Sequence, residues 1–172
     1  MLDPGSMTSG LPPVQTEDPV AMVENLVRLA AQSAGSTSAS FFKLDGPSLH
    51  PWYVYGLPPE YVAACGPVPV GEQCCGRAVA FRKPWVVSDM LTDPDWVHMR
   101  SEIEKTEIRA AFSVPVMLNG SCIGSLACHF KKPYQPSSEA IMRNETFATL
   151  IAFAFKRFAD ELERNSRYSA PA

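Results

Sequence analysis

The stretch RAAFSVPVMLNGSCIGSLACHF, residues 109–130, predicts a β-hairpin. Two extended apolar runs are joined by Asn119-Gly120, the dipeptide that best tolerates the positive φ angles of a two-residue hairpin turn. Alternation along the second run puts apolar side chains on both faces: Cys122, Leu126 and Cys128 on one, Ile123, Ala127 and His129 on the other. Because neither face is strongly polar, we expect the hairpin to lie in a sheet that is covered on both sides.

The segments before the hairpin predict two more strands and several short helices. Asp18 and Pro19 are typical of an N-cap and first helical position, and apolar residues then recur at helical spacing as far as Gly35. Strands are expected at 38–44 and 49–56, paired antiparallel across the turn residues 45–47. Short helices are expected at 57–65 and 74–82, a strand at 84–89, and a helix that starts at Asp93-Pro94.

The segment after the hairpin predicts a long amphipathic helix. Ser137 can cap it, and we expect it to run to about Arg164. Its apolar stripe at spacings of three and four consists of Phe147, Leu150, Ile151, Ala154, Phe155, Phe158 and Leu162. Together the elements indicate an α+β domain with a central antiparallel sheet.

Length and composition indicate one domain. The chain has 172 residues, of which 46% are hydrophobic, enough for a single core. We expect a disordered tail or expression scar at 1–16, one domain at 17–166 and a frayed end at 167–172. A formal net charge of -3 disfavours nucleic acid as a direct partner. No apolar run is long enough to cross a bilayer, so a cytoplasmic location without membrane contact is expected.

Three fragments carry a resemblance to a known family. In chain order they are GEQCCGRAVAFRKPWVVSDMLTDPDW, IRAAFSVPVMLNGSCIGSLACHF and PSSEAIMRNETFATLIAFAFKR. From about Ser38 to Arg157 the chain resembles a GAF domain, and especially the GAF sensor modules of bacterial histidine kinases. The resemblance implies a sheet with the first and last helices on one face, often as a dimer interface, and a small-molecule pocket on the other face.

That resemblance also implies which segments form the pocket. Its walls would come from residues 74–79, 87–89 and 96–100 and from the inward positions of the hairpin. Together with the aromatic residues of the second strand, this makes the candidate ligand-binding residues Tyr53, Tyr55, Cys75, Asp89, Trp96, Met99, Phe112 and His129. Asp89 could instead cap the next turn, and the aromatic residues could belong to the core.

Cys74 and Cys75 at the start of a short helix have two interpretations. A thiol at a helix N-terminus has its pKa lowered by the unpaired amides, which would make either cysteine a redox sensor. Alternatively, Cys75 and Gly76 are small residues that let the helix pack closely against the sheet. The five cysteines, an odd number at irregular spacings, indicate reduced thiols rather than a disulfide framework.

Two other function classes remain as alternatives. A free methionine-R-sulfoxide reductase of the same family has a cysteine ten positions before its CG motif, as Cys65 precedes Cys75 here. The reacting thiol of that enzyme lies further on, where this chain has no cysteine between Cys75 and Cys122. A non-covalent bilin or haem receptor would use His129, whereas Val97-His98 stands where covalent bilin attachment needs Cys-His.

The sequence therefore predicts a regulatory domain that is not itself an enzyme. It would bind a small-molecule ligand or sense redox state, and would signal through a dimerising C-terminal helix to an output domain such as the kinase of a two-component system. No catalytic residue is assigned, and the cysteines and histidines show no metal-ligand spacing. The cofactor, if any, is unknown from the sequence.

Overall fold

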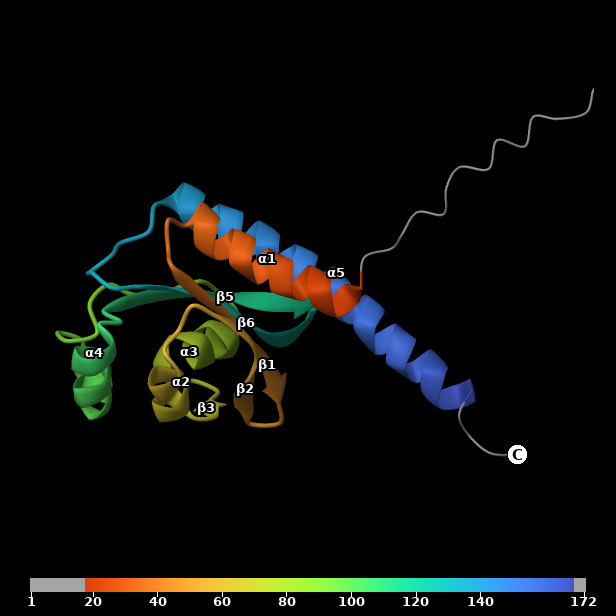
Figure 1. Ribbon diagram of the computed structural model, residues 1–172, viewed down its shortest axis with the longest axis horizontal. Helices are drawn as coiled ribbons and strands as arrows, with labels where there is room; N and C mark the ends of the chain where they lie inside the picture. The colour runs from red at the N-terminus through yellow and green to blue at the C-terminus, as the bar shows by residue number, and fades with distance from the viewer. Residues whose placement is uncertain (1–17, 169–172) are drawn as a thin grey trace, which may run out of the picture.

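The computed structural model describes residues 18–168 (Figure 1). The expected tail at 1–16 and the last residues, 169–172, lie outside this part of the chain. Six strands form one antiparallel sheet in the order β3-β2-β1-β6-β5-β4. The strands are β1 (Ser38–Asp45), β2 (Ser48–Tyr55), β3 (Val68–Pro69), β4 (Trp85–Val87), β5 (Ala110–Leu118) and β6 (Ser121–Phe130). The expected α+β fold with a central antiparallel sheet is confirmed.

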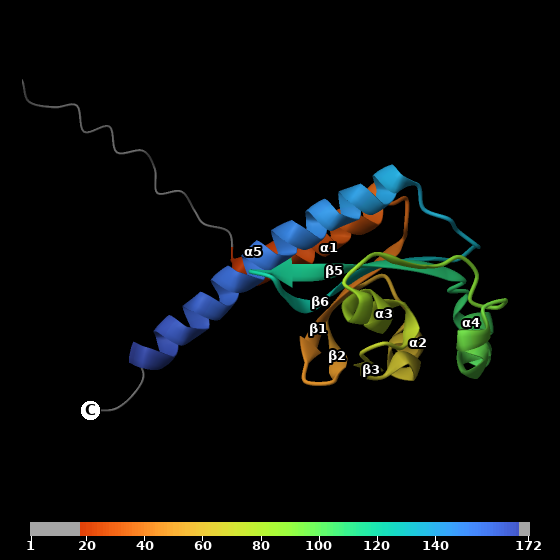
Figure 2. The same cartoon turned by 180° about the vertical axis from the view of Figure 1, so that it is seen from behind.

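Two long helices cover one face of the sheet. α1 (Pro19–Ser33) and α5 (Ser138–Tyr168) lie side by side, as both views show (Figure 1, Figure 2). Asp18 caps α1 by accepting a hydrogen bond from the Val20 amide, as predicted. The Arg143 side chain donates to Ser33 at 3.1 Å, which places the start of α5 beside the end of α1, so the two helices are antiparallel.

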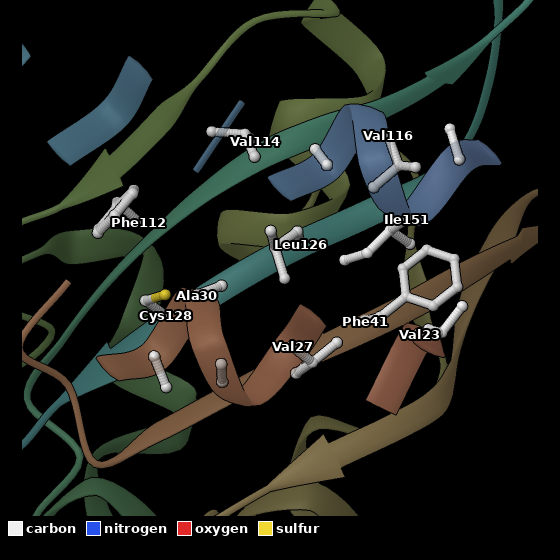
Figure 3. Close-up of a cluster of buried hydrophobic side chains, with 14 of the residues drawn as sticks. Val23, Val27, Ala30, Phe41, Phe112, Val114, Val116, Leu126, Cys128 and Ile151 are labelled. Atoms are coloured by element: carbon white, nitrogen blue, oxygen red, sulfur yellow. The ribbon is translucent and has the colours of Figure 1, made fainter. Parts of the chain in front are cut away.

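The main core lies between these helices and the sheet. Val23, Val27 and Ala30 of α1 and Ile151 of α5 meet Phe41, Phe112 and Leu126 from three strands (Figure 3). All seven residues are fully buried. Burial of apolar surface on this scale is the dominant favourable contribution to folding. The apolar stripe of α5 therefore stabilises the sheet by packing against this face.

The other face carries the short helices. These are α2 (Pro59–Cys65), α3 (Gln73–Phe81), the 3-10 helix η1 (Pro94–Met99) and α4 (Arg100–Thr106). Two smaller clusters fill this side, one around Tyr61, Trp96 and Ile103 and one around Phe42 and Leu49. The ligand side expected from the resemblance is therefore the side of α2 and α3 (Figure 1).

The predicted hairpin is confirmed, but its second strand contains an irregularity. Asn119 and Gly120 form the turn with φ angles of 50° and 79°. The register shifts between Val116 and Met117, opposite Cys122 and Gly124, so Ile123 is the extra residue. As a result Cys122 packs on the face covered by α3 and Ile123 on the face covered by α1 and α5, which is the reverse of what simple alternation predicts.

Helix boundaries differ from expectation at two places. α5 continues past Arg164 to Tyr168, and its last turns extend beyond the sheet (Figure 1). Ion pairs Lys156–Asp160 and Arg157–Glu161 stand at i,i+4 spacing there, an arrangement that supports an exposed helix. The helix that starts at Asp93-Pro94 is confirmed in position, with a 3-10 first half. Within residues 18–168, no helix is long and apolar enough to cross a membrane.

Candidate functional site: a cavity between the sheet and the short helices

The position of α3 depends on one glycine. A Cβ atom on Gly76 would lie 2.1 Å from the carbonyl oxygen of Pro69 in β3. The Gly71 amide also donates to the Gly76 carbonyl at 2.9 Å. Only glycine permits this approach of helix to strand, so the close-packing interpretation of the Cys75-Gly76 pair is confirmed for Gly76.

Beneath α3 lies a nearly enclosed cavity of about 20 Å³. That volume holds about one water molecule. The wall consists of Ser40, Phe42, Leu57, Tyr61, Val62, Cys65, Val68, Gln73, Cys74, Cys75, Trp96, Ala111 and His129. β1, β5 and β6 supply the floor, while α2, α3 and η1 supply the roof.

Two polar atoms of this wall stand out. Ser40 Oγ and His129 Nδ1 are both buried, and within the described chain neither has a hydrogen-bond partner. An unsatisfied buried polar group costs about 1–3 kcal/mol, and native structures contain few of them. Both residues line the same cavity, which indicates a site for a polar group that the described strands and helices do not supply.

The environment of His129 fixes its ionisation state. Burial lowers the pKa of its imidazole to about 4, so the ring is neutral at pH 7. The Tyr61 ring meets the imidazole edge-on at 6.0 Å between centroids. The backbone carbonyl of His129 accepts hydrogen bonds from Ser36 and Ser38, which secures the strand end beside α1.

The thiols of the wall are protonated. Burial raises the pKa of Cys74 well above its ordinary value and also raises that of Cys75, while Cys65 reaches about 12. Cys74 Sγ donates to the Trp85 carbonyl at 3.3 Å. Desolvation thus outweighs the helix N-terminus, and the pKa lowering on which the redox-sensor interpretation depends does not occur in this conformation.

The predicted pocket residues fall into four groups. Cys75, Trp96 and His129 line the cavity. Met99 is buried in the neighbouring cluster with Trp96 but does not reach the wall. Asp89 follows β4 and accepts three hydrogen bonds from the Arg109 guanidinium and one from the Leu91 amide, so it fixes the next turn and lies outside the cavity wall.

Three of the expected pocket residues lie on the opposite face. The expectation that Tyr53, Tyr55 and Phe112 line the cavity is wrong, because all three pack against the core under α1 and α5. Tyr53 OH accepts a hydrogen bond from Arg28 of α1 at 2.8 Å. Phe112 stacks with Phe130 at 6.1 Å between centroids. Aromatic residues are common in ligand pockets, but the alternation of side chains along each strand places these three on the face away from the cavity.

Sequence reasoning missed several wall residues, Ser40, Tyr61 and Gln73 among them. A signal for Ser40 exists in the run SASFFKL, where Ser38, Ser40 and Phe42 alternate with two apolar residues. Serines on the inward face of a buried strand indicate a polar contact there. Tyr61 and Gln73 lie on short helices next to Gly66 and Gly71, which both have positive φ angles, and helices this short carry too little periodicity to predict which side chains face the sheet.

The described residues offer no metal site. Among residues 18–168, no group of three or more His, Cys, Asp or Glu side chains is arranged to hold an ion. Cys65, Cys74, Cys75 and His129 share the cavity wall without forming such a group. All five cysteines are free thiols.

The architecture is therefore an antiparallel sheet with two terminal helices on one face and a partly enclosed cavity under short helices on the other. The family model of the GAF domain matches residues 18–155. The chain therefore belongs to the GAF domain family. Among curated proteins, none matches the sequence significantly.

Solved structures share the fold. A domain of a putative two-component sensor histidine kinase protein from Sinorhizobium meliloti 1021 is 18% identical with a TM-score of 0.70, covering 84% of this chain and 95% of that one. The GAF domain of a phosphoenolpyruvate-protein phosphotransferase from Coxiella burnetii is 16% identical with a TM-score of 0.71, at 86% and 88% coverage. A free methionine-R-sulfoxide reductase from Neisseria meningitidis is 23% identical with a TM-score of 0.67, at 83% and 80% coverage.

Proposed function

We propose that this GAF domain is a non-catalytic sensory module that binds a small molecule in the cavity beneath α3. The observation that carries the proposal is a pair of orphaned polar atoms, Ser40 Oγ and His129 Nδ1, on two residues that line one partly enclosed cavity. A ligand that satisfies both atoms recovers the free energy that their burial costs. Occupancy of the cavity therefore favours one arrangement of its walls.

A short route connects the cavity to α5. His129 faces the cavity, while its neighbour Cys128 faces the opposite side of β6. The Asn144 amide of α5, itself buried, donates to Cys128 Sγ at 3.3 Å. A shift of β6 on ligand binding would therefore act directly on the start of α5, and the rigid helix would carry it beyond the sheet.

The outer surface of α5 supports a homodimer. Three apolar residues lie on its solvent side, Met142 at 60%, Leu150 at 45% and Phe153 at 61% exposure. Further along, Leu162 continues the buried stripe past the sheet with 54% of its surface exposed. We infer that a second copy covers these side chains, and that paired α5 helices lead into an output domain such as a histidine kinase.

One observation supports the reductase alternative, but the reactive thiolate that such an enzyme needs is missing. Cys65 and Cys75, ten positions apart, both line the cavity. Their thiols are protonated, and among residues 18–168 no carboxylate lies in the wall, so no thiolate is available to attack a sulfoxide. Turnover of free methionine sulfoxide with thioredoxin, abolished by Cys75→Ser, would establish the enzyme instead.

A screen of thermal stability tests ligand binding. Wild-type protein, Ala111→Leu and Tyr53→Phe are compared against a library of cellular metabolites by differential scanning fluorimetry. Ala111 lies in the cavity wall, so leucine there fills it, whereas Tyr53 lies on the opposite face and serves as the control. We expect compounds that raise the Tm of wild-type and Tyr53→Phe but not of Ala111→Leu. Compounds that stabilise all three equally, or none at all, would contradict the proposal.

A further inference from the structure

The wall of the cavity is uncharged. Of the residues that line it in the described chain, none is Asp, Glu, Lys or Arg. The groups that can ionise are neutral at pH 7: the His129 pKa is lowered by burial, and the pKa values of Tyr61, Cys65, Cys74 and Cys75 are raised by it. A charged ligand would lose its hydration on entering the cavity and would find no opposite charge there, which is strongly unfavourable.

The nearby charges are engaged elsewhere. Arg77 of α3 pairs with Asp95 near the surface, and its guanidinium lies 5.2 Å from the centroid of the Trp85 ring. Arg109 is held by Asp89 through a bidentate contact outside the cavity wall. Both arginines are thus already paired with carboxylates, and neither belongs to the wall that holds Ser40 and His129.

The spacing of the two orphaned groups suits one bridging group. Ser38 pairs directly with His129 across β1 and β6, so Ser40 is the diagonal neighbour of His129 on the same face. Residues in this relation stand roughly 7–8 Å apart, with their Cβ atoms somewhat closer, and no hydrogen bond joins Ser40 Oγ to His129 Nδ1. The hydroxyl can donate or accept, and the neutral imidazole nitrogen can do either according to its tautomer.

We propose that the site selects an uncharged ligand that presents a hydrogen-bond donor and an acceptor on one edge, as a primary amide, a lactam or a nucleobase does. This inference rests on the proposed function, namely that the cavity binds a ligand. The apolar ring of such a compound meets Phe42, Val68 and Trp96, while its polar edge bridges Ser40 and His129.

Admission of a ring requires the roof to move. α2 has seven residues and supplies Tyr61, Val62 and Cys65 to the wall. Gly56 and Gly66 bracket it, with φ angles of 69° and 58°. Displacement of this short helix enlarges the cavity without breaking the antiparallel sheet beneath it.

Matched pairs of compounds test the charge selection. Isotope-labelled protein at pH 7 is titrated with nicotinamide or nicotinate, and with uracil or orotate, while the amide and side-chain NMR signals of Ser40 and His129 are followed. Each pair shares a ring: nicotinate has a carboxylate in place of the carboxamide of nicotinamide, and orotate has a carboxylate in place of a ring hydrogen of uracil, so the second pair keeps the donors and acceptors of the ring and changes the charge. We expect the neutral member to bind at least tenfold more tightly than the acid. Ser40→Ala should weaken nicotinamide binding roughly fivefold to tenfold, whereas Tyr53→Phe, which removes a hydroxyl on the opposite face of the sheet, should not.

Each outcome decides a different point. Acids that bind at Ser40 and His129 as tightly as their neutral partners would overturn the charge selection and leave the sensory function standing. Binding by none of the four compounds would overturn the ligand class, and the metabolite screen would then decide the sensory function separately. Nicotinamide binding that is equal in wild-type and Ser40→Ala would overturn the bridging geometry.

Discussion

The α-carbon of Gly76 faces the carbonyl oxygen of Pro69 so closely that a side chain there would place its Cβ 2.1 Å away. Helix α3 rests on strand β3 at this point, and the cysteines that precede the glycine form part of the cavity wall. The contact links a sequence feature, the Cys-Gly pair, to the geometry of the site.

Gly76→Ala is therefore expected to destabilise the domain. The clashing atom is backbone, so the cost follows overpacking and should reach roughly 1–3 kcal/mol or more, even though alanine has the better helix propensity. Urea unfolding followed by circular dichroism gives the free energy of unfolding. Ala80→Gly, on the exposed side of the same helix, is the reverse control and should cost only about 0.5–1 kcal/mol. A Gly76→Ala protein as stable as wild type would show that α3 does not rest on β3.

His129 should make the domain sensitive to acid. Its folded pKa of about 4 lies below the ordinary 6.5, so its contribution to stability is intact above about pH 6.5 and is lost as pH falls towards 4. The full difference corresponds to about 3 kcal/mol. In His129→Leu this part of the loss should disappear, as measured by urea unfolding at pH 7.5, 5.5 and 4.5.

A matched substitution separates this effect from general acid denaturation. His98 is exposed on η1, and His98→Gln should leave the slope due to His129 in place. If wild type and His129→Leu lose stability in parallel between pH 6.5 and 4.5, the imidazole is solvated and the cavity is not closed around it.

The cysteines should differ in their rates of alkylation. Burial raises the pKa of all three thiols, Cys74, Cys75 and Cys122, but the first two are buried whereas Cys122 is half-buried at the hairpin and so more accessible. Iodoacetamide at pH 7 should therefore modify Cys122 well before Cys74 or Cys75 in the native protein, and all five cysteines rapidly in urea. Peptide mass spectrometry of timed samples measures the order. Native labelling of Cys74 or Cys75 as fast as that of Cys122 would restore the redox-sensor interpretation.

Phe153→Glu should dissociate the proposed dimer. Phe153 is 61% exposed on α5, and a carboxylate there would be buried without a partner in the interface. Sedimentation velocity over a range of concentrations should show a dimer for wild type and a monomer for the variant. Val97→Glu, at a residue 62% exposed on η1, is the control and should remain dimeric. A wild-type protein that stays monomeric would contradict the interface.

The fold was largely predictable because its signals are local. Asn119-Gly120 fixes the hairpin, Asp18-Pro19 starts α1, and Asp93-Pro94 starts η1. These are turn and capping preferences, which act within a few residues. β3 was not predicted, because its two residues carry no periodic pattern and pair only through the tertiary fold.

The site was less predictable because it depends on which way each strand faces. The bulge at Ile123, opposite Val116 and Met117, reverses the sheet faces on which Cys122 and Ile123 were expected. The side chains of Tyr53 and Phe112 point to the face covered by α1 and α5 and pack in the core there. A one-residue shift of register moves every side chain to the other face. Cys75 and His129 were found because each stands in a fragment that also carries the family resemblance.

Native mass spectrometry of the purified domain tests ligand binding and dimerisation together, because it reports bound small molecules and oligomeric state in one spectrum. We expect a dimer that retains, or takes up from a metabolite extract, an uncharged compound of low mass, and an Ala111→Leu protein that does not. A wild-type protein that takes up nothing from the extract, or an Ala111→Leu protein that binds the same compound as wild type, would contradict ligand binding in this cavity.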